Sequence, residues 1–283
     1  MSEKVMLVTG ASSGIGRATA VGLARHGARV LLVGRNPARC EAALAAVRAA
    51  GGASAEILRA DFSSLDGVRK LADDVLARTE RLDVLVNNAA TVVMGRSVTP
   101  DGYETQFAVN HLSYFLLTGL LLPRLRAKTP TRIVNVASDA HVSAPIDLDD
   151  LQNERRYSVF RVYGQSKSAN ILWTQELARR LGGAGVTANC LHPGTIRTNL
   201  GRGNGVALDL FQRAISLFMK SPDTGAETSI YLATSPDVAE VSGRYFANSR
   251  EKAPAPHATD PAVARRLWQI SEELVGFSYL TES

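Results

Sequence analysis

The chain has 283 residues, of which 45% are hydrophobic and 21% are charged. It contains no long run of proline, serine or like charge, so the disordered, collagen-like and mucin-like classes are excluded, and its length suits one α/β domain. The formal net charge of +5 suggests nucleic acid or a membrane surface as a partner. The basic residues, however, are scattered beside acids and apolar helix faces, which is typical of solvated helix surfaces. We therefore expect a globular protein with no nucleic-acid partner.

Short β-branched runs alternate with longer amphipathic segments along most of the chain. This alternation predicts right-handed crossovers and a single Rossmann-type, doubly wound parallel sheet of about seven strands with helices on both faces. Strands are expected at 5–9, 29–33, 55–59, 84–87, 132–136, 186–191 and 243–247. Helices are expected near 15–26, 37–50, 64–79, 102–126, 160–182, 224–234 and 262–276. We expect one domain over 1–283, with a cofactor half at 1–130 and a catalytic half at 131–283.

Two segments interrupt this alternation and are expected to shape a ligand pocket. Residues 139–160 are polar, with several Asp, Glu and Arg, whereas residues 195–224 are first glycine-rich and then apolar. Long excursions of this kind in a compact domain tend to be lids or binding loops. They could instead cover the sheet or contact a partner subunit, and the sequence leaves both alternatives open.

A glycine-rich turn, Thr-Gly-Ala-Ser-Ser-Gly-Ile-Gly over residues 9–16, joins the first strand to the first helix. Glycines permit close approach of the backbone, and a helix N-terminus offers free N–H groups and a partial positive charge to a pyrophosphate. A simple chain reversal would also explain the glycines, but the strand before and the helix and strand after favour dinucleotide binding. The residues expected to contact the dinucleotide here are Gly10, Ser12, Ser13, Gly14, Ile15 and Gly16.

The end of the second strand indicates which dinucleotide is bound. NAD-selective sites carry a carboxylate there, whereas this chain has Gly34 followed by Arg35. A guanidinium suits a phosphate dianion, so Arg35 favours NADP(H); alternatively, Arg35 is only a solvated loop residue. Asp61, after the third strand, is expected with its neighbour Phe62 beside the adenine, although an acid there could equally cap the next helix.

Tyr163 and Lys167 form the most informative pair in the chain. They lie four residues apart in a predicted helix, so they project from one face. A nearby ammonium favours the phenolate, and we expect it to lower the pKa of Tyr163 from about 10 towards neutrality. Tyr-x-x-x-Lys also occurs by chance on helix surfaces. Ser138, after the fifth predicted strand, and Asn110, a modest helix former inside a predicted helix, support a catalytic role.

The cysteines and histidines predict neither a disulfide framework nor a metal site. Cys40 and Cys190 are the only cysteines and lie far apart, which fits a reducing cytoplasm. His111 and His141 have no second ligand at metal spacing, so no metal is expected.

The chain enters its first strand at once, and its longest apolar stretch, 114–122, is too short to cross a bilayer. We therefore expect a cytoplasmic protein with no membrane span. Only six of its 32 basic residues are lysines, which resembles the residue usage of a bacterium with a GC-rich genome.

Taken together, these motifs resemble the short-chain dehydrogenase/reductase family, in its classical branch. The matching segments follow the family's order along the chain: residues 9–16, Asn-Asn-Ala-Ala at 87–90, Asn110, Ser138, Tyr163 to Lys167, and His-Pro-Gly at 192–194. Ala90 departs from the glycine of many members. Further likeness, to the retinol dehydrogenase group and its WW-domain-containing oxidoreductase relatives, lies at 132–141, 166–172, 175–180 and 264–274. Those animal proteins often carry an N-terminal hydrophobic anchor, which we do not expect here, and the likeness does not imply retinol as the substrate.

The resemblance implies a catalytic centre of Asn110, Ser138, Tyr163 and Lys167. Tyr163 would donate a proton to a carbonyl oxygen as hydride arrives from the nicotinamide, and Ser138 would orient and stabilise that oxygen. Lys167 would lower the pKa of Tyr163 and hold the nicotinamide ribose, and Asn110 would position a water that restores the proton. Thr195 is a candidate for binding the carboxamide. The cofactor cleft would also be lined by Asn87, Ala89, Pro193, Gly194, Ile196 and Thr198.

The sequence thus predicts an NADP(H)-dependent carbonyl reductase or alcohol dehydrogenase. We expect a bulky, mostly apolar ketone, aldehyde or secondary alcohol as substrate, such as a bacterial secondary metabolite, a lipid or a steroid-like ring, because 195–224 could form an apolar lid. The alternatives are a non-catalytic dinucleotide-binding sensor and an NAD-dependent alcohol dehydrogenase acting in the oxidative direction. Family members commonly pair through the helices corresponding to 102–126 and 160–182, so we expect a homodimer or tetramer. The 262–276 helix could alter that surface and leave a monomer.

Overall fold

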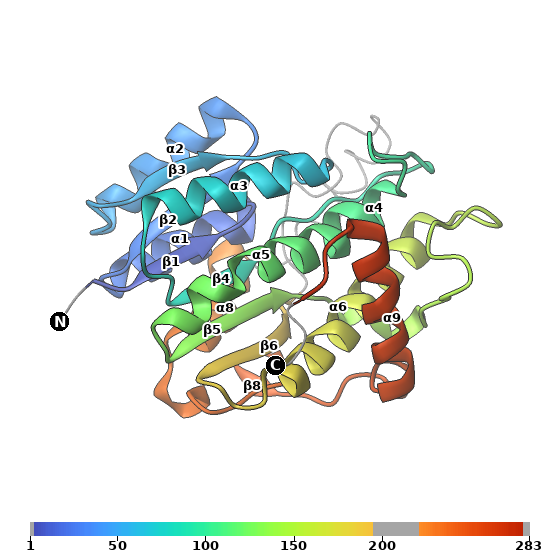
Figure 1. Ribbon diagram of the computed structural model, residues 1–283. Helices are drawn as coiled ribbons and strands as arrows, with labels where there is room; N and C mark the ends of the chain where they lie inside the picture. Colours follow the sequence, from blue (N-terminus) through green and yellow to red (C-terminus); the bar gives the residue numbers. More distant parts are fainter. Residues whose placement is uncertain (1–2, 195–220, 280–283) are drawn as a thin grey trace.

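The computed structural model describes residues 3–194 and 221–279, which build one eight-stranded sheet between layers of helices (Figure 1). The strand order is β3-β2-β1-β4-β5-β6-β7-β8. All neighbouring strands from β3 to β7 are parallel, and β8 is antiparallel to β7. The direction of winding reverses between β1 and β4, and ligands of such sheets bind at this switch point. The strands are β1 Val5–Val8, β2 Arg29–Gly34, β3 Glu56–Arg59, β4 Val84–Asn87, β5 Thr131–Val136, β6 Val186–His192, β7 Tyr245–Ala247 and β8 Arg250–Glu251.

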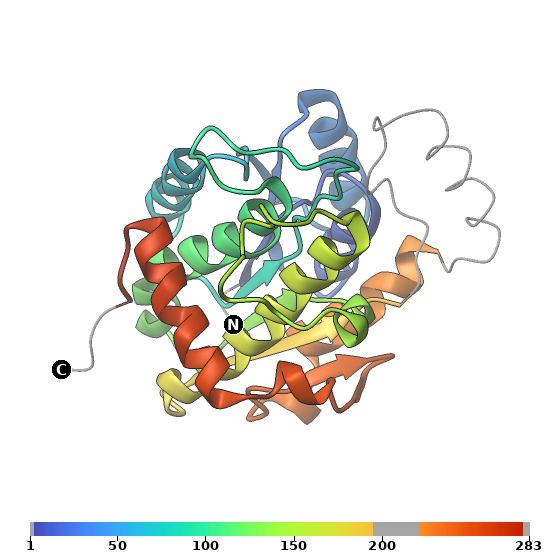
Figure 2. The same cartoon turned by 90° about the vertical axis from the view of Figure 1, so that its right-hand side faces the viewer.

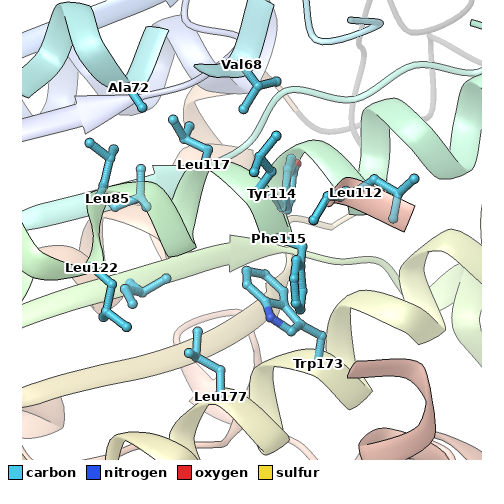
Figure 3. Packing of buried hydrophobic residues seen from close by; sticks show 14 of the residues in the cluster. Val68, Ala72, Leu85, Leu112, Tyr114, Phe115, Leu117, Leu122, Trp173 and Leu177 are labelled. Carbon is cyan, nitrogen blue, oxygen red and sulfur yellow. The ribbon is translucent and has the colours of Figure 1, made fainter. Parts of the chain in front are cut away.

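Helices cover both faces of the sheet, so the central strands are buried on both sides. One core contains Leu7 and Leu85 of the sheet with side chains of α3, α5 and α6; the other contains Met6 and Val8 with side chains of α1, α2 and α8. Figure 3 shows the first core around Phe115, whose ring centroid lies 6.0 Å from that of Trp173. The helices are α1 Gly14–Arg25, α2 Pro37–Ala49, α3 Leu65–Arg78, α4 Thr105–Phe107, α5 Ser113–Ala127, α6 Val159–Leu181, α8 Pro222–Thr234 and α9 Pro261–Val275. Short helical turns are η1 Ala108–Leu112, η2 Asp139–Ser143, η4 Pro236–Val238 and η5 Pro256–Ala258.

All seven predicted strands are found, and their limits shift by at most two residues. The eighth strand, β8, was not predicted, because it has only two residues and both are exposed. Asn248 and Ser249 form the two-residue connection to β7 with φ values of 50° and 55°. Positive φ at both positions is typical of a tight hairpin turn. Among the helices that the structure describes, none is both long and apolar enough to span a membrane.

The predicted helix at 102–126 is divided into three consecutive segments, α4, η1 and α5. Gly102 has a φ of 85°, so the regular helix begins only after it. Glu104 is fully buried, and its carboxylate accepts hydrogen bonds from the backbone N–H groups of Gln106, at 3.0 Å, and Phe107, at 2.7 Å. The next segment, η1, is a π-helical turn, a local widening that is frequent at functional sites. It contains Asn110.

Helix α9 packs against α6 and η1 on the outside of the first helical layer (Figures 1 and 2), and its Trp268 reaches Phe115 of α5. The Trp268 ring centroid lies 5.1 Å from that of Phe115 and 4.5 Å from that of Tyr279. A Cβ on Gly119 would lie 2.5 Å from the ring of Phe277, so the glycine permits this close approach. The chain's own C-terminal helix therefore occupies part of the surface over α5 and α6 through which the family resemblance predicts pairing of two copies.

Candidate active site

The carboxyl ends of four strands bring the predicted site residues to one edge of the sheet. Thr9 follows β1, and its hydroxyl oxygen accepts hydrogen bonds from the backbone N–H groups of Asn88, at 2.8 Å, and Ala89, at 3.0 Å, after β4. Ser138 follows β5, and His192 ends β6. Because this edge includes the switch point between β1 and β4, it is where the fold predicts a ligand.

Ser138, Tyr163 and Lys167 converge at this edge. The Ser138 side chain lies close enough to the Tyr163 phenol to lower its pKa. Lys167 is only 1% exposed, and its Nζ donates to the backbone oxygen of Val136 at 3.0 Å. The same Nζ lies 5.6 Å from the ring centroid of Tyr163 and 5.7 Å from that of Tyr114. The ammonium group is therefore placed within cation–π distance of two tyrosine rings.

Burial governs the ionisation of Tyr163 and Lys167. It raises the pKa of Tyr163 to about 12, and the Ser138 side chain opposes this only in part. It lowers the pKa of Lys167 from 10.5 to about 7, because a low-dielectric surrounding disfavours the charged ammonium. The expectation that Lys167 brings the pKa of Tyr163 towards neutrality is therefore wrong. The two side chains share one helix face as predicted, but desolvation is the largest cause of both pKa shifts.

Asn110 is fully buried in η1 and joins three parts of the site. Its Oδ1 accepts from the backbone N–H of Thr91 at 2.8 Å, and its Nδ2 donates to the Thr91 oxygen at 3.1 Å. The same Nδ2 donates to Ser166 Oγ at 3.0 Å. The Asn110 backbone oxygen accepts from Asn170 Nδ2 at 2.9 Å. Hydrogen bonds of Asn110 thus connect the segment after β4 to α6, the helix that carries Tyr163 and Lys167.

The glycine-rich turn has the geometry of a phosphate cradle. Gly10 and Gly14 have φ values of 65° and 54°, which side chains disfavour. A Cβ on Gly16 would lie 2.3 Å from the backbone oxygen of Gly10. Ser13 stands at the N-cap of α1 but makes no capping hydrogen bond, whereas α2 and α3 have side-chain caps. The N–H groups that begin α1 are thus left for an anion, and the turn fits the pyrophosphate of a dinucleotide.

Arg35 and Asp61 face each other after β2 and β3. Arg35 Nη1 lies 3.4 Å from Asp61 Oδ2, and the side chains are 76% and 46% exposed. The other Asp61 oxygen accepts from the backbone N–H of Ser63 at 3.0 Å and from its hydroxyl at 2.8 Å. Partial burial raises the pKa of Asp61, but these hydrogen bonds and the Arg35 charge outweigh it and bring the pKa below its usual value. Ser64, which accepts from Gly67 N, caps α3, so the alternative that Asp61 is the cap is wrong.

Some of the predicted cofactor residues do not present their side chains to this edge. Asn87 is fully buried, and its Nδ2 donates to Thr118 Oγ1 and Asn135 Oδ1, both at 2.9 Å. Phe62 is 9% exposed and packs in the first core. Thr195, Ile196, Thr198 and most of the expected lid at 195–224 lie outside the described residues. Among the predicted site residues that the structure describes, Arg35 is exposed, and those partly exposed are Gly10, Ser12, Ser13, Gly14, Ile15, Asp61, Ser138, Tyr163, Pro193 and Gly194.

Sequence reasoning missed Asp139, which directly follows Ser138, and its two partners Tyr245 and Lys252. Asp139 Oδ1 accepts from Tyr245 Oη at 2.7 Å and from Lys252 Nζ at 2.8 Å. More than 100 positions separate Asp139 from either partner, so no local spacing signals the contact. It depends on β7 lying next to β6 and on the unpredicted hairpin to β8. His192 Nδ1 accepts from the Asp139 backbone N–H at 3.2 Å.

The buried histidine beside the site is held by neutral partners. His111 Nδ1 lies 3.1 Å from Asn170 Oδ1, and its Nε2 lies 3.0 Å from Ser271 Oγ. Burial lowers the pKa of His111 to about 4. Within residues 3–194 and 221–279, no group of three or more His, Cys, Asp or Glu side chains could hold a metal ion.

Comparison with known proteins agrees with this arrangement. A profile described as short chain dehydrogenase matches residues 4–206. Retinol dehydrogenase 14 of Mus musculus is 48% identical, over 98% of this chain and 87% of the relative. Retinol dehydrogenase 13 of Homo sapiens is 45% identical, over 96% of this chain and 85% of the relative.

Solved structures show the same fold. An uncharacterised protein from Mycobacterium paratuberculosis superposes with a TM-score of 0.80 at 34% identity, over 99% of this chain and 96% of that one. The Pseudomonas aeruginosa RhlG/NADP active-site complex superposes with a TM-score of 0.68 at 30% identity, over 87% and 94% of the two chains. The chain therefore belongs to the short-chain dehydrogenase family, in its retinol dehydrogenase-like group, and its reaction class is nicotinamide-dependent oxidoreduction of alcohols and carbonyls.

Proposed function

We propose that this protein is an NADP(H)-dependent carbonyl reductase or alcohol dehydrogenase that acts on bulky, mostly apolar ketones, aldehydes or secondary alcohols. The observation that carries the proposal is the convergence of Ser138, Tyr163 and Lys167 beside the uncapped glycine-rich turn. A dinucleotide-binding sensor needs the turn but not these three side chains together.

The chain's own groups are suited to protonating a carbonyl oxygen. When bound, NADPH supplies the hydride that the carbonyl carbon receives. Tyr163, whose pKa is raised to about 12 by burial, keeps its proton at neutral pH and donates it to the carbonyl oxygen, so the C=O group becomes CH–OH. The Ser138 hydroxyl stabilises the charge that develops on that oxygen. Lys167 would hold the nicotinamide ribose, and with Asn110 and a water it would return a proton to Tyr163.

The preference for NADP(H) is proposed from the charge at the end of β2. Arg35 is 76% exposed and meets Asp61 only at 3.4 Å, so its guanidinium can turn to a 2′-phosphate at little cost. Gly34 leaves no carboxylate at the position where NAD-selective sites bind the ribose hydroxyls. Asp61 is proposed to lie beside the adenine.

The apolar substrate class is supported by side chains around Ser138 and Tyr163. The exposed large hydrophobic side chains of the described residues are Met94, Val98, Val142 and Phe160. Val142 follows Ser138 in η2, and Phe160 lies one helical turn before Tyr163 in α6. The segment that carries Met94 is tied to the one before α6, since Tyr157 Oη donates to the Val93 oxygen at 2.8 Å. We propose that Val142, Phe160 and Met94 rim the substrate entrance.

We infer a bacterial, cytoplasmic enzyme. A homodimer through α5 and α6 has to share its surface with α9, so a monomer, or pairing elsewhere, becomes the stronger alternative to the expected dimer or tetramer. Light scattering of the purified protein at several concentrations distinguishes these states directly.

The proposal is tested by substituting Tyr163→Phe and measuring NADPH oxidation with nonanal, trans-decalone and retinal. Retinal is included because the relatives carry the name retinol dehydrogenase. We expect turnover of at least one probe by the wild type, loss of turnover in Tyr163→Phe by about 10³-fold or more, and nearly unchanged NADPH affinity by fluorescence titration. Full activity in the variant would overturn the mechanism. Binding of NADPH without turnover of any probe by the wild type would favour a sensor instead.

A further inference from the structure

The Ser138 hydroxyl depends on the backbone that follows it. Its Oγ accepts from the Ala140 N–H at 3.1 Å, which leaves the hydroxyl proton to be donated towards the phenol or a substrate oxygen. The Ser138 backbone oxygen lies 2.7 Å from His141 Nδ1, and His141 Nε2 accepts from the Ala255 N–H at 3.0 Å. The first turn of η2 therefore sets the direction of the Ser138 hydroxyl. His141, which is hydrogen-bonded to Ala255, holds that turn in place.

Asp139 is the most strongly held residue of this turn. Its carboxylate accepts from Tyr245 Oη at 2.7 Å and from Lys252 Nζ at 2.8 and 2.9 Å. Tyr245 is almost fully buried in β7, whereas Lys252 directly follows β8 and its side chain is 45% exposed. Partial burial raises the pKa of Asp139, but these two partners and the nearby His192 outweigh it and hold the pKa below its usual value. The carboxylate is therefore charged at neutral pH.

Asp139 also contacts the turn on the other side of the site. Its backbone N–H donates to His192 Nδ1 at 3.2 Å, so a neutral His192 carries its proton on Nε2. That Nε2 lies 3.6 Å from Asp139 Oδ2. His192 directly precedes Pro193 and Gly194, the turn that is proposed to line the nicotinamide. One residue thus contacts both the segment that aims Ser138 and the segment that would hold the reacting ring.

We propose that Asp139 is a positioning residue that holds Ser138 and the turn at 193–194 in the relative positions that hydride transfer requires. Its carboxylate is held in turn by Tyr245 of β7 and by Lys252, which directly follows β8. The inference rests on the proposed function for its catalytic consequence, but the coupling of the two segments can be measured without turnover. It also assigns a use to β8, the short strand that the sequence did not predict.

The first experiment compares Asp139→Asn and Lys252→Met with the wild type, using the probe among nonanal, trans-decalone and retinal that is turned over fastest. We expect kcat to fall by about 10- to 100-fold, since small misplacements of reacting groups have effects of this size. The KM for NADPH should stay within about threefold, and the kinetic isotope effect with 4-deuterated NADPH should rise, because hydride transfer becomes slower relative to the other steps. Lys252→Arg should restore most of the activity, since it restores the charge.

Glu251→Gln is the matched control. It removes an exposed ion pair of the same hairpin, in which Arg244 Nη1 lies 3.7 Å from Glu251 Oε1, and does not touch Asp139. Lys252 is half exposed, so Lys252→Met is expected to fold even if Asp139→Asn does not. A wild-type kcat and isotope effect in Lys252→Met would overturn the proposal, as would a loss of activity no larger than that of Glu251→Gln.

Hydrogen exchange of the protein alone provides the second readout. In Asp139→Asn, or in Lys252→Met if the former fails to fold, amides at 137–143 and at 191–194 should both exchange faster than in the wild type and in Glu251→Gln. Faster exchange at 137–143 alone would show that the two segments are not coupled and would overturn the proposal. If no probe is turned over by the wild type, the proposed function fails, while this measurement still decides whether Asp139 couples the segments.

Discussion

The candidate site has two ends, which are built in opposite ways. We call them the nucleotide end, with the glycine-rich turn, Arg35 and Asp61, and the chemical end, with Ser138, Tyr163 and Lys167. At the nucleotide end, Arg35 is 76% exposed and meets Asp61 at only 3.4 Å, and the phosphate cradle consists of backbone N–H groups. At the chemical end, Lys167 is 1% exposed and donates to Val136 at 3.0 Å. An exposed ion pair rearranges easily and contributes little to stability, whereas a buried charge has to be fixed by its surroundings. The comparison indicates that cofactor choice is adjustable at one end, while the reacting groups are held rigid at the other.

The largest effect should come from loosening α9, which packs against α6, the helix that carries Tyr163 and Lys167. Trp268→Ala removes a ring that is 1% exposed and that packs on Phe115, Tyr279 and the Arg180 guanidinium, 4.3 Å from the ring centroid. We expect the free energy of unfolding to fall by about 3–5 kcal/mol, measured by urea denaturation. Arg265→Ala, at an exposed position of the same helix, should change it by less than about 0.5 kcal/mol. A loss below about 1 kcal/mol in Trp268→Ala would show that α9 is not a structural cover.

Sequence reasoning succeeded where a local pattern fixes the geometry. Hydrophobic periodicity and motif spacing act within a few residues. They predict the strands of the parallel sheet, the glycine-rich turn and the pair formed by Tyr163 and Lys167. It failed where long-range packing decides. Asp139 meets Lys252 only because of a two-residue hairpin strand. The pKa of Tyr163 is set mainly by desolvation of its phenol in the folded protein, which a spacing of four residues does not report.

An intermediate effect should appear in the pH dependence of stability. The pKa of Lys167 is about 7 in the folded protein, against 10.5 for a free side chain, so the unfolded chain binds more protons between these values. The free energy of unfolding should therefore rise with pH from about 7 upwards, by at most about 1.4 kcal/mol per pH unit. Lys167→Met should remove this rise and be more stable than the wild type below pH 7, as measured by urea denaturation from pH 6 to about 9.

Lys128→Met is the control for this prediction, because Lys128 is exposed at the end of α5. Its stability should follow the wild-type pH dependence. Parallel curves for the wild type and Lys167→Met would mean that the ammonium is not disfavoured by its surroundings, and the contrast between the two ends of the site would then lose its electrostatic basis.

The smallest effect is expected at the nucleotide end. Arg35→Ala should weaken NADPH binding by about 10- to 100-fold, the range of one charge-assisted contact, and leave NADH binding within about twofold, as measured by fluorescence titration. Arg35→Asp should go further and favour NADH, because it adds a carboxylate near the ribose hydroxyls. Asp61→Asn removes the competing partner of Arg35, so NADPH should bind up to about fivefold more tightly, a limit set by the small strength of an exposed ion pair. Equal losses of NADPH and NADH affinity in Arg35→Ala would instead assign Arg35 to the shape of the turn and leave the enzyme without a phosphate-selective group at this position.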